Sequence, residues 1–252
     1  MQNLEIVGEG ATTKIYRDGD RAIKLYVDAP PHEAENEARR QTFAVEAGLP
    51  VPAVFAVRKL DESVTALDME YIAGKPIIHE AMSIEEQRTA IGVMVKLQCA
   101  VHAVHATDHT RLADRLAWKI THNDFLAQPA KDSLLSLLHS LEGGSHHLCH
   151  GDFHPQNILY DGSKYWIIDW VDSTAGNPLA DACRTYLIFK QYMPCSAETY
   201  LSLFCKEAGV KQEDILVWMP IIAAARLREN MSGEMRAQLV KIVEECTPSA
   251  LV

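Results

Sequence analysis

The chain lacks the features that mark membrane proteins and disulfide-stapled proteins. Its six cysteines are scattered and form no C-x-x-C pair, so in a chain of this length we expect reduced thiols and no disulfide framework. The longest apolar run, residues 215–225, is too short to cross a bilayer and contains Pro220. Glu5 and Glu9 stand where a signal peptide would be apolar. We therefore expect a soluble, cytoplasmic protein with no membrane partner.

An excess of positive charge is also missing. The net charge is −10 with a pI near 5.5, which argues against a nucleic-acid partner and would suit a cationic substrate. The 252 residues are 48% hydrophobic, enough for a substantial core in one compact unit or in two lobes.

Chemically informative residues are concentrated at 150–157, which reads H-G-D-F-H-P-Q-N. Gly151 and Pro155 predict a loop, because both residues interrupt regular structure. Asp152 and Asn157 would therefore lie on that loop.

A short hairpin is predicted directly after this loop. Residues 158–160 and 165–168 are apolar and aromatic, as in strands, and a turn at Asp161-Gly162 joins them. Such a hairpin would bring Asp169 back beside Asn157. Carboxylate and amide oxygens suit Mg²⁺, which takes its other ligands from phosphate and water.

The pattern H-G-D-x-H-x-x-N followed by I-D-W resembles the aminoglycoside and choline kinase family, small-molecule relatives of protein kinases. The resemblance implies an α+β, two-lobed protein-kinase-like fold, with a β-rich N-terminal lobe and a mainly helical C-terminal lobe. It also implies that Asp152 orients the acceptor hydroxyl and takes its proton, while Asn157 and Asp169 hold Mg²⁺. D-F-G and H-R-D are absent, which favours the small-molecule branch over protein kinases.

The same resemblance assigns nucleotide contacts near the N-terminus. Gly8 and Gly10 lie in a turn between two predicted strands, where glycine backbone can approach phosphate oxygens. Taken alone these two glycines favour a plain hairpin, and Thr13 stands where a third glycine would be. The next strand carries Lys24, which the resemblance places on the α/β phosphates of ATP. The alternative is a solvated lysine on an edge strand.

A charged helix over residues 33–47 would supply the glutamate that pairs with this lysine. Glu33, Glu35 and Glu37 compete for the role, and helix-dipole compensation explains the other two. Glu37 is chosen because it stands eleven residues before Gly48, as the ion-pair glutamate does in the family.

A hinge is expected where two antiparallel strands, 53–59 and 64–71, lead to Gly74. The resemblance implies that Met69 lines an adenine pocket and that backbone groups of Glu70 and Ile72 reach the base. A methionine on a strand is otherwise ordinary core. The predicted boundary follows, with residues 1–74 as the nucleotide-covering lobe and 75–252 as the catalytic and acceptor-binding lobe.

The second lobe should begin with a long helix, because Ser83 to Glu86 form an S-x-x-E capping box. One apolar face is predicted on this helix, formed by Ile84, Ile91, Met94, Leu97, Val101 and Val104. Further helices are predicted near 109–119, 130–142, 178–193, 196–208, 211–229 and 231–246.

Several histidines invite a metal interpretation that we do not favour. His102 and His105 are better explained as packed or capping residues, and the Cys and His residues at 146–150 have no second cluster at zinc-ligand spacing. His150 is expected to orient the loop and His154 to do the same or approach phosphate.

Two aspartates follow the hairpin. The resemblance gives Asp181 a bracing role toward the catalytic loop. For Asp172, substrate contact and simple solvation are equally supported. Glu229, Glu234 and Glu244 could form a negative wall or be ordinary surface charges.

The sequence therefore predicts a phosphotransferase that depends on ATP and Mg²⁺ and moves the γ-phosphoryl group to a hydroxyl of a small molecule. Aminoglycoside, choline-like amine, sugar, amino alcohol and macrolide stay open as acceptors, and the oligomeric state is not readable. The alternatives are an atypical small protein kinase and an inactive nucleotide-binding relative.

Overall fold

The computed structural model describes residues 5–9 and 13–246, which form two compact units. Unit 1 combines the chain up to Met82 with Pro155–Asp172, and unit 2 combines Ser83–His154 with the chain from Ser173 onward. The boundary near residue 74 stays a prediction. Within the described residues, no helix is both long and apolar enough to cross a membrane.

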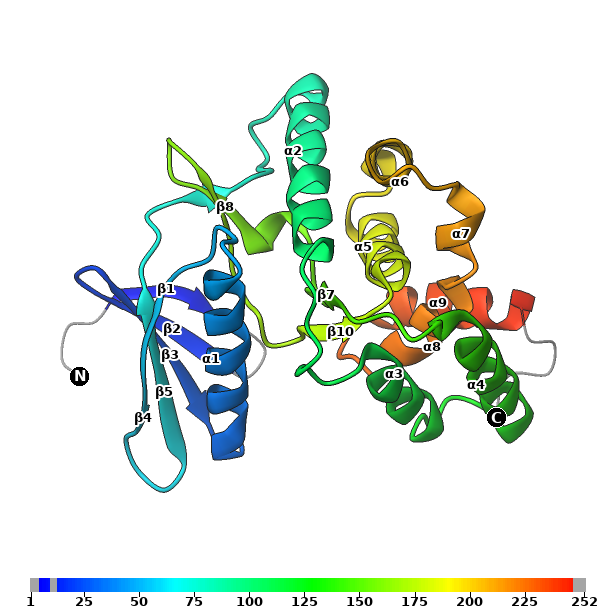
Figure 1. The fold of residues 1–252 in the computed structure, drawn as a ribbon, viewed down its shortest axis with the longest axis horizontal. Coiled ribbons are helices and arrows are strands. Elements are labelled where there is room, and N and C mark those ends of the chain that lie inside the picture. The colour runs from blue at the N-terminus through cyan, green and yellow to red at the C-terminus, as the bar shows by residue number, and fades with distance from the viewer. Residues whose placement is uncertain (1–4, 10–12, 247–252) are drawn as a thin grey trace. The chain divides into compact units, whose positions relative to one another are not determined.

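Unit 1 contains an antiparallel five-stranded sheet with the strand order β1-β2-β3-β5-β4. Helix α1 runs alongside this sheet (Figure 1) and packs on it through Tyr26, Ala34, Ala38 and Leu67. The elements are β1 (Glu5–Glu9), β2 (Thr13–Asp18), β3 (Arg21–Val27), α1 (Pro31–Glu46), β4 (Val54–Lys59) and β5 (Val64–Glu70).

A small second sheet in unit 1 confirms the predicted hairpin. Its strands are β6 (Lys75–Pro76), β8 (Ile158–Tyr160) and β9 (Tyr165–Ile167), preceded by the 3₁₀ turn η1 (Pro155–Asn157). The Asp161 carboxylate accepts bonds from the N–H groups of Ser163 and Lys164 at 2.7 and 2.9 Å, which closes the turn. The N–H of Ile167 donates to the Pro50 carbonyl at 2.8 Å. Two segments far apart in sequence are thereby joined.

Unit 2 is mainly helical, as expected. Its elements are α2 (Ile84–His102), α3 (Leu112–Thr121), α4 (Gln128–Glu142), β7 (His147–Cys149), β10 (Thr174–Gly176), α5 (Pro178–Tyr192), α6 (Pro194–Ala208), α7 (Gln212–Leu216), α8 (Met219–Arg226) and α9 (Gly233–Cys246). Strands β7 and β10 pair antiparallel. Tyr200 and Phe204 of α6 are fully buried and, with Phe189 of α5, form part of its core.

Helix α2 confirms the capping box and corrects the predicted apolar face. The Ser83 hydroxyl accepts from the Glu86 N–H, and the Glu86 carboxylate accepts from the Ser83 N–H. Ile91 and Met94 are buried, but Ile84 is 86% exposed. The predicted burial of Ile84 is wrong. Ile84 is the first residue of the helix, and the helical period of apolar residues does not show where along a helix the packing against neighbouring elements begins.

The predicted helix over 211–229 is wrong, because the segment folds as α7 and α8 with a break between them. Pro220 lies in the first turn of α8. Proline lacks an N–H and clashes with the carbonyl one turn earlier, so a continuous helix cannot pass through it. The other predicted helices are present, with ends that differ by up to three residues.

Candidate functional site

Lys24 and Glu37 form a buried ion pair in unit 1. Lys24 lies on β3 and Glu37 on α1, and the Lys24 Nζ lies 2.9 Å from the Glu37 Oε1. Their exposures are 4% and 1%, whereas Glu33 and Glu35 are exposed. A lysine on a solvated edge strand is therefore not what the structure contains.

Asp169 reaches the same lysine from a distant part of the sequence. The Lys24 Nζ lies 3.0 Å from the Asp169 Oδ1, and the Asp169 side chain is 43% exposed. Trp170 is fully buried and donates its indole N–H to the Ile167 carbonyl, so packing fixes the chain on one side of Asp169. The φ of Asp169 is +65°, a left-handed conformation that aspartate tolerates better than most residues.

Asn157 lies next to this group. The N–H of Ile168 donates to the Asn157 carbonyl at 2.9 Å, which fixes the residue before Asp169 against the end of the loop. In unit 1, Lys24 thus contacts both Glu37 and Asp169. A backbone hydrogen bond connects Asn157 to Ile168, the residue before Asp169.

Burial and charge set the protonation of this cluster. Burial acts to lower the pKa of Lys24, but the carboxylates of Glu37 and Asp169 outweigh it and raise the pKa above its ordinary value. Burial raises the pKa of Glu37 to about 7, against the opposing effect of Lys24. Lys24 is therefore a permanent cation, while Glu37 titrates near neutrality.

The donor set fits Mg²⁺ bound together with a phosphate. Asp169 offers a half-exposed carboxylate and Asn157 an amide, both hard oxygen donors. Among the described residues no three His, Cys, Asp or Glu side chains are grouped to hold a metal ion. Two protein donors suit an ion that keeps several waters and shares phosphate oxygens.

The other predicted nucleotide contacts are only partly described. Gly8 lies in β1 next to a register shift in its pairing with β2, and Gly10 lies outside the described residues. Met69 packs on the core between sheet and α1. The Glu70 N–H donates to the Ala53 carbonyl at 2.8 Å, and the Ile72 carbonyl accepts from the Gly74 N–H at 2.9 Å.

In unit 2, Asp181 braces the loop that carries Asp152. One carboxylate oxygen of Asp181 accepts from the Gly151 N–H at 2.8 Å. The other accepts from the His150 N–H at 3.4 Å and bonds the His102 ring at 2.9 Å. The His150 ring in turn accepts from the Asp152 N–H at 3.3 Å. His102 and His150 thus have the packed and orienting positions expected of them.

Asp152 itself contacts two basic side chains. Its Oδ2 lies 3.2 Å from the His154 Nε2, and its Oδ1 accepts from the Arg184 Nη2 at 3.3 Å. Arg184 also donates through Nε to the Gly151 carbonyl. Burial acts to raise the pKa of Asp152, but the His154 bond and the Arg184 charge hold it well below its ordinary value. The aspartate is ionised at neutral pH.

Glu229 forms ion pairs with three basic side chains, one of which, Arg184, also contacts Asp152. The sequence did not predict this network. The Glu229 Oε1 lies 2.6 Å from the Arg184 Nη1 and 3.4 Å from the Lys119 Nζ, and the Glu229 Oε2 lies 2.9 Å from the Arg226 Nε. Burial acts to raise the pKa of Glu229, but these cations lower it to about 2. Glu229 is an ion-pair partner inside this network, which differs from both alternatives left open for it, a negative wall and an ordinary surface charge.

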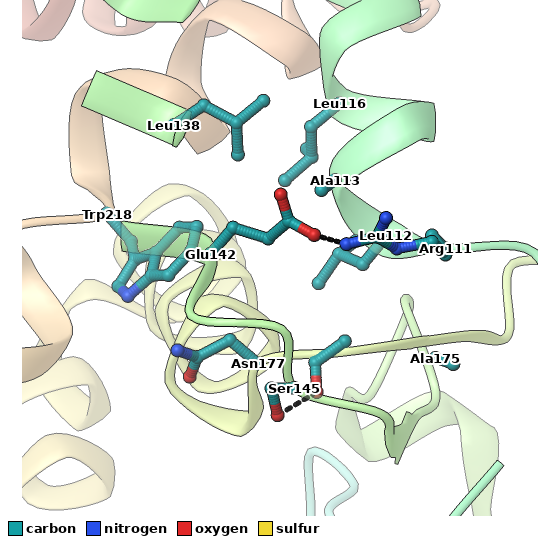
Figure 2. A pocket seen from close by; sticks show the side chains of 11 residues that line it. Arg111, Leu112, Ala113, Leu116, Leu138, Glu142, Ser145, Ala175, Asn177 and Trp218 are labelled. Atoms are coloured by element: carbon teal, nitrogen blue, oxygen red, sulfur yellow. Dashed lines mark hydrogen bonds and ion pairs between the residues drawn. The ribbon is translucent and has the colours of Figure 1, made fainter. Parts of the chain in front are cut away.

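A second set of polar groups in unit 2 lines a small cavity and is structural. Figure 2 shows Arg111, at the start of α3, paired with Glu142 at the end of α4. Nearby, the Ser145 hydroxyl donates to the Gly176 carbonyl at 2.8 Å (Figure 2). The cavity measures about 10 Å³, room for about one water molecule, and these groups join α3, α4 and β10.

Comparison with known proteins decides the family. The model of the phosphotransferase enzyme family (APH) matches residues 4–204. The chain belongs to this family. It is therefore a phosphotransferase. A search of curated protein sequences gave no match.

Solved structures with the same fold include kinases for different small molecules. The phosphotransferase superposes on the aminoglycoside phosphotransferase APH(4)-Ia with a TM-score of 0.73 and 16% identity, over 98% of this chain and 94% of the other. For choline kinase LicA from Streptococcus pneumoniae the values are 0.67 and 13%, over 96% and 94%. A choline/ethanolamine kinase family protein from Mesorhizobium loti gives 0.62 and 21%, over 97% and 86%. The protein-kinase-like fold predicted from the sequence is thereby confirmed.

Proposed function

We propose that the phosphotransferase uses ATP and Mg²⁺ and transfers the γ-phosphoryl group to a hydroxyl of a small molecule. The observation that carries this proposal is the contact of the buried Lys24 with both the buried Glu37 and the half-exposed Asp169. A permanent cation beside a half-exposed carboxylate is the arrangement that a triphosphate and its metal ion require. In the same fold, a variant of APH(4)-Ia has been crystallised with AMP-PNP and hygromycin B.

In this proposal the residues of unit 1 hold the nucleotide. Lys24 neutralises the α/β phosphates, and Glu37 keeps its side chain extended toward them. Asn157 and Asp169 would hold Mg²⁺, which when bound neutralises charge on the phosphate oxygens. The Glu70 carbonyl and the Ile72 N–H are the hinge groups proposed to reach the adenine, beside Met69, while Gly8 and Gly10 cover the phosphates.

Asp152 performs the acceptor half of the reaction. As an ionised carboxylate it accepts a hydrogen bond from the acceptor hydroxyl, which aligns the attacking oxygen with the γ-phosphorus. The oxygen–phosphorus bond forms as the bond to the ADP leaving group breaks, and the hydroxyl proton passes to Asp152. A low pKa suits this role, because a loose transition state depends more on alignment than on basicity.

The substitution Asp152→Asn tests the assignment. We expect nucleotide affinity to stay within about twofold, because Asp152 belongs to the acceptor half, while turnover falls by ~10²-fold or more, the usual scale for a general base. Turnover is measured as formation of ADP from ATP, with or without acceptor, and nucleotide affinity by calorimetry. Near-normal turnover in this variant would show that Asp152 has another role.

Two other functions make different predictions. An inactive relative would bind nucleotide without any phosphoryl transfer, and a small protein kinase would label proteins. Lys24, Asp152 and Asp169 are all present, which favours an active enzyme. The short gap between Asp169 and the start of α5 at Pro178 leaves no length for a peptide-docking activation segment.

A further inference from the structure

Several basic side chains lie around Asp152 and Glu229. Lys119, Arg184 and Arg226 all pair with the single carboxylate of Glu229. Asp152 is the other carboxylate in this network, through its bond with Arg184. Among the described residues, these three cations lie around Glu229 and Asp152, although the whole chain has a net charge of −10.

A fourth cation lies at the edge of this network. Arg228, adjacent to Glu229 in sequence, is exposed, and its guanidinium carbon lies 4.7 Å from the centre of the Trp118 ring. Trp118 is 54% exposed and precedes Lys119 on α3. The cation–π contact holds the charge of Arg228 on the surface beside the network.

The carboxylate oxygens of the network already have basic side chains as partners. Both oxygens of Glu229 accept from basic side chains, and both oxygens of Asp152 contact Arg184 or His154. A substrate ammonium group would need a carboxylate with charge to spare. An ammonium placed here would instead meet the repulsion of the surrounding cations.

Arg226 has a buried hydrogen-bond donor that is not satisfied by the described residues. It is 5% exposed, and its Nη1 has no hydrogen-bond partner among the described residues. Burial and the neighbouring Arg184 charge lower the pKa of Arg226. An unpaired buried donor costs ~1–3 kcal/mol, and an anionic oxygen is the partner that best removes this cost for a guanidinium.

We infer that the acceptor of the phosphotransferase carries an anionic group, a carboxylate or a phosphate, besides its hydroxyl. Lys119, Arg226 and Arg228 bind this anionic group, and Asp152 takes the hydroxyl. The inference rests on the proposed function and narrows it. It differs from the cationic acceptor that the overall charge suggests, because Arg226, a buried cation of this network, has a guanidinium nitrogen without a hydrogen-bond partner among the described residues.

Four small hydroxyl compounds that differ mainly in charge test this inference. Glycerate is the carboxylate probe, glycerol 3-phosphate the phosphate probe, glycerol the neutral probe and serinol the cationic probe. Binding is measured by calorimetry on the full chain with ADP and Mg²⁺ present. We expect at least one anionic probe to bind about tenfold more tightly than serinol, and the stronger of the two identifies carboxylate or phosphate. Equal binding of all four, tighter binding of serinol, or no binding of either anion overturns the inference.

A charge-reversal pair locates the site. Arg228→Glu changes an exposed residue, so it should fold, and we expect it to weaken the anionic probe by about three- to tenfold. Arg88→Glu changes net charge equally at an exposed position of α2, an element with no group in the network, and should leave the affinity within about twofold. Equal effects of the two variants would mean that only overall charge matters, and would refute the site.

Slow phosphoryl transfer to water separates failure of this inference from failure of the proposed function. Transfer to water requires the nucleotide site and no acceptor. If phosphate release is measurable and serinol is the preferred probe, only the anionic acceptor is wrong. If neither water nor any probe receives phosphate, the proposed function fails as well.

Discussion

At the scale of single residues, Lys24 lies between two carboxylates that differ in exposure. Glu37 is buried and Asp169 is half-exposed, so Glu37 carries the desolvation cost and its pKa rises to about 7. The buried partner therefore orients the lysine, and the exposed partner is available to a metal ion. This division of roles gives the pair a measurable response to pH.

We expect nucleotide affinity to fall as pH decreases from 8 to 6. Because the pKa of Glu37 is about 7, its carboxylate is ionised above that pH and protonated below it, and its hold on Lys24 weakens in the acidic range. Glu37→Gln removes the titrating group, so its affinity should be lower but vary less. Nucleotide phosphates titrate too, so the difference between the two calorimetric profiles is the readout. Parallel profiles would contradict the role of Glu37.

Asp181 supports a stability prediction. Burial acts to raise its pKa, but the bonds with His102 and Gly151 outweigh burial and hold the pKa below its ordinary value. Its contribution is thus complete above the unfolded pKa, near ~4, and is lost as pH falls through the folded value. Asp181→Ala should lower the free energy of unfolding by ~3 kcal/mol at pH 7, measured with urea. Asp108→Ala, at an exposed position, should change it by less than ~0.5 kcal/mol.

At the scale of elements, strand β10 approaches helix α3 more closely than a side chain would allow. A Cβ on Gly176 would overlap the side chain of Leu112, the first residue of α3. Glycine is therefore required here for a packing reason, since the backbone itself is not left-handed. Substitution should push the start of α3 away from the strand.

Gly176→Ala should destabilise the protein by ~1–3 kcal/mol, the usual cost of overpacking. Leu112→Gly alone should also destabilise it, because it removes apolar contacts and puts a glycine in the first turn of α3. In the double variant the Leu112 Cβ, the atom nearest to the added methyl, is absent, so the overlap is relieved and the two effects should sum to more than the measured loss. Urea unfolding of the four proteins measures this coupling, and strict additivity would rule out the proposed overlap.

Most helices and strands, and the contact of Lys24 with Glu37 and Asp169, could be predicted from the sequence because they follow from local signals and ordered motifs. The positions of Lys24, Glu37 and Asp169 follow from motifs whose order along the chain is fixed, and the capping box at Ser83 is a local signal. Arg184 and Glu229 carried no such signal, because charged residues are frequent on helices and only tertiary packing brings these two together. The helix break near Pro220 could have been predicted, because proline is a local signal. The exposure of Ile84 could not, because it depends on tertiary packing.

At the scale of the whole molecule, charge is unevenly distributed. A chain with ten more acidic than basic residues places Lys119, Arg184 and Arg226 around Glu229 and Asp152. Overall composition therefore describes the average surface and not the charge at one particular site.

Unit 1 is formed by two separate stretches of the chain, which predicts that the first stretch alone is less stable. A fragment of residues 1–82 lacks β8, β9 and Asp169, so β6 has no partner strand and Lys24 keeps only one carboxylate. We expect this fragment to unfold at lower urea concentration than unit 1 does within the full chain. Addition of a peptide covering residues 155–172 should raise its stability in proportion to peptide concentration. A fragment that is already as stable without the peptide would contradict this view.

Because unit 1 is assembled from two stretches separated by seventy-two residues, it cannot be finished in the order in which it is translated. Lys24 and Glu37 leave the ribosome early, but the stretch that carries Asp169 ends only at residue 172. During synthesis the first-made third of the chain therefore stays incomplete until most of the protein has been translated.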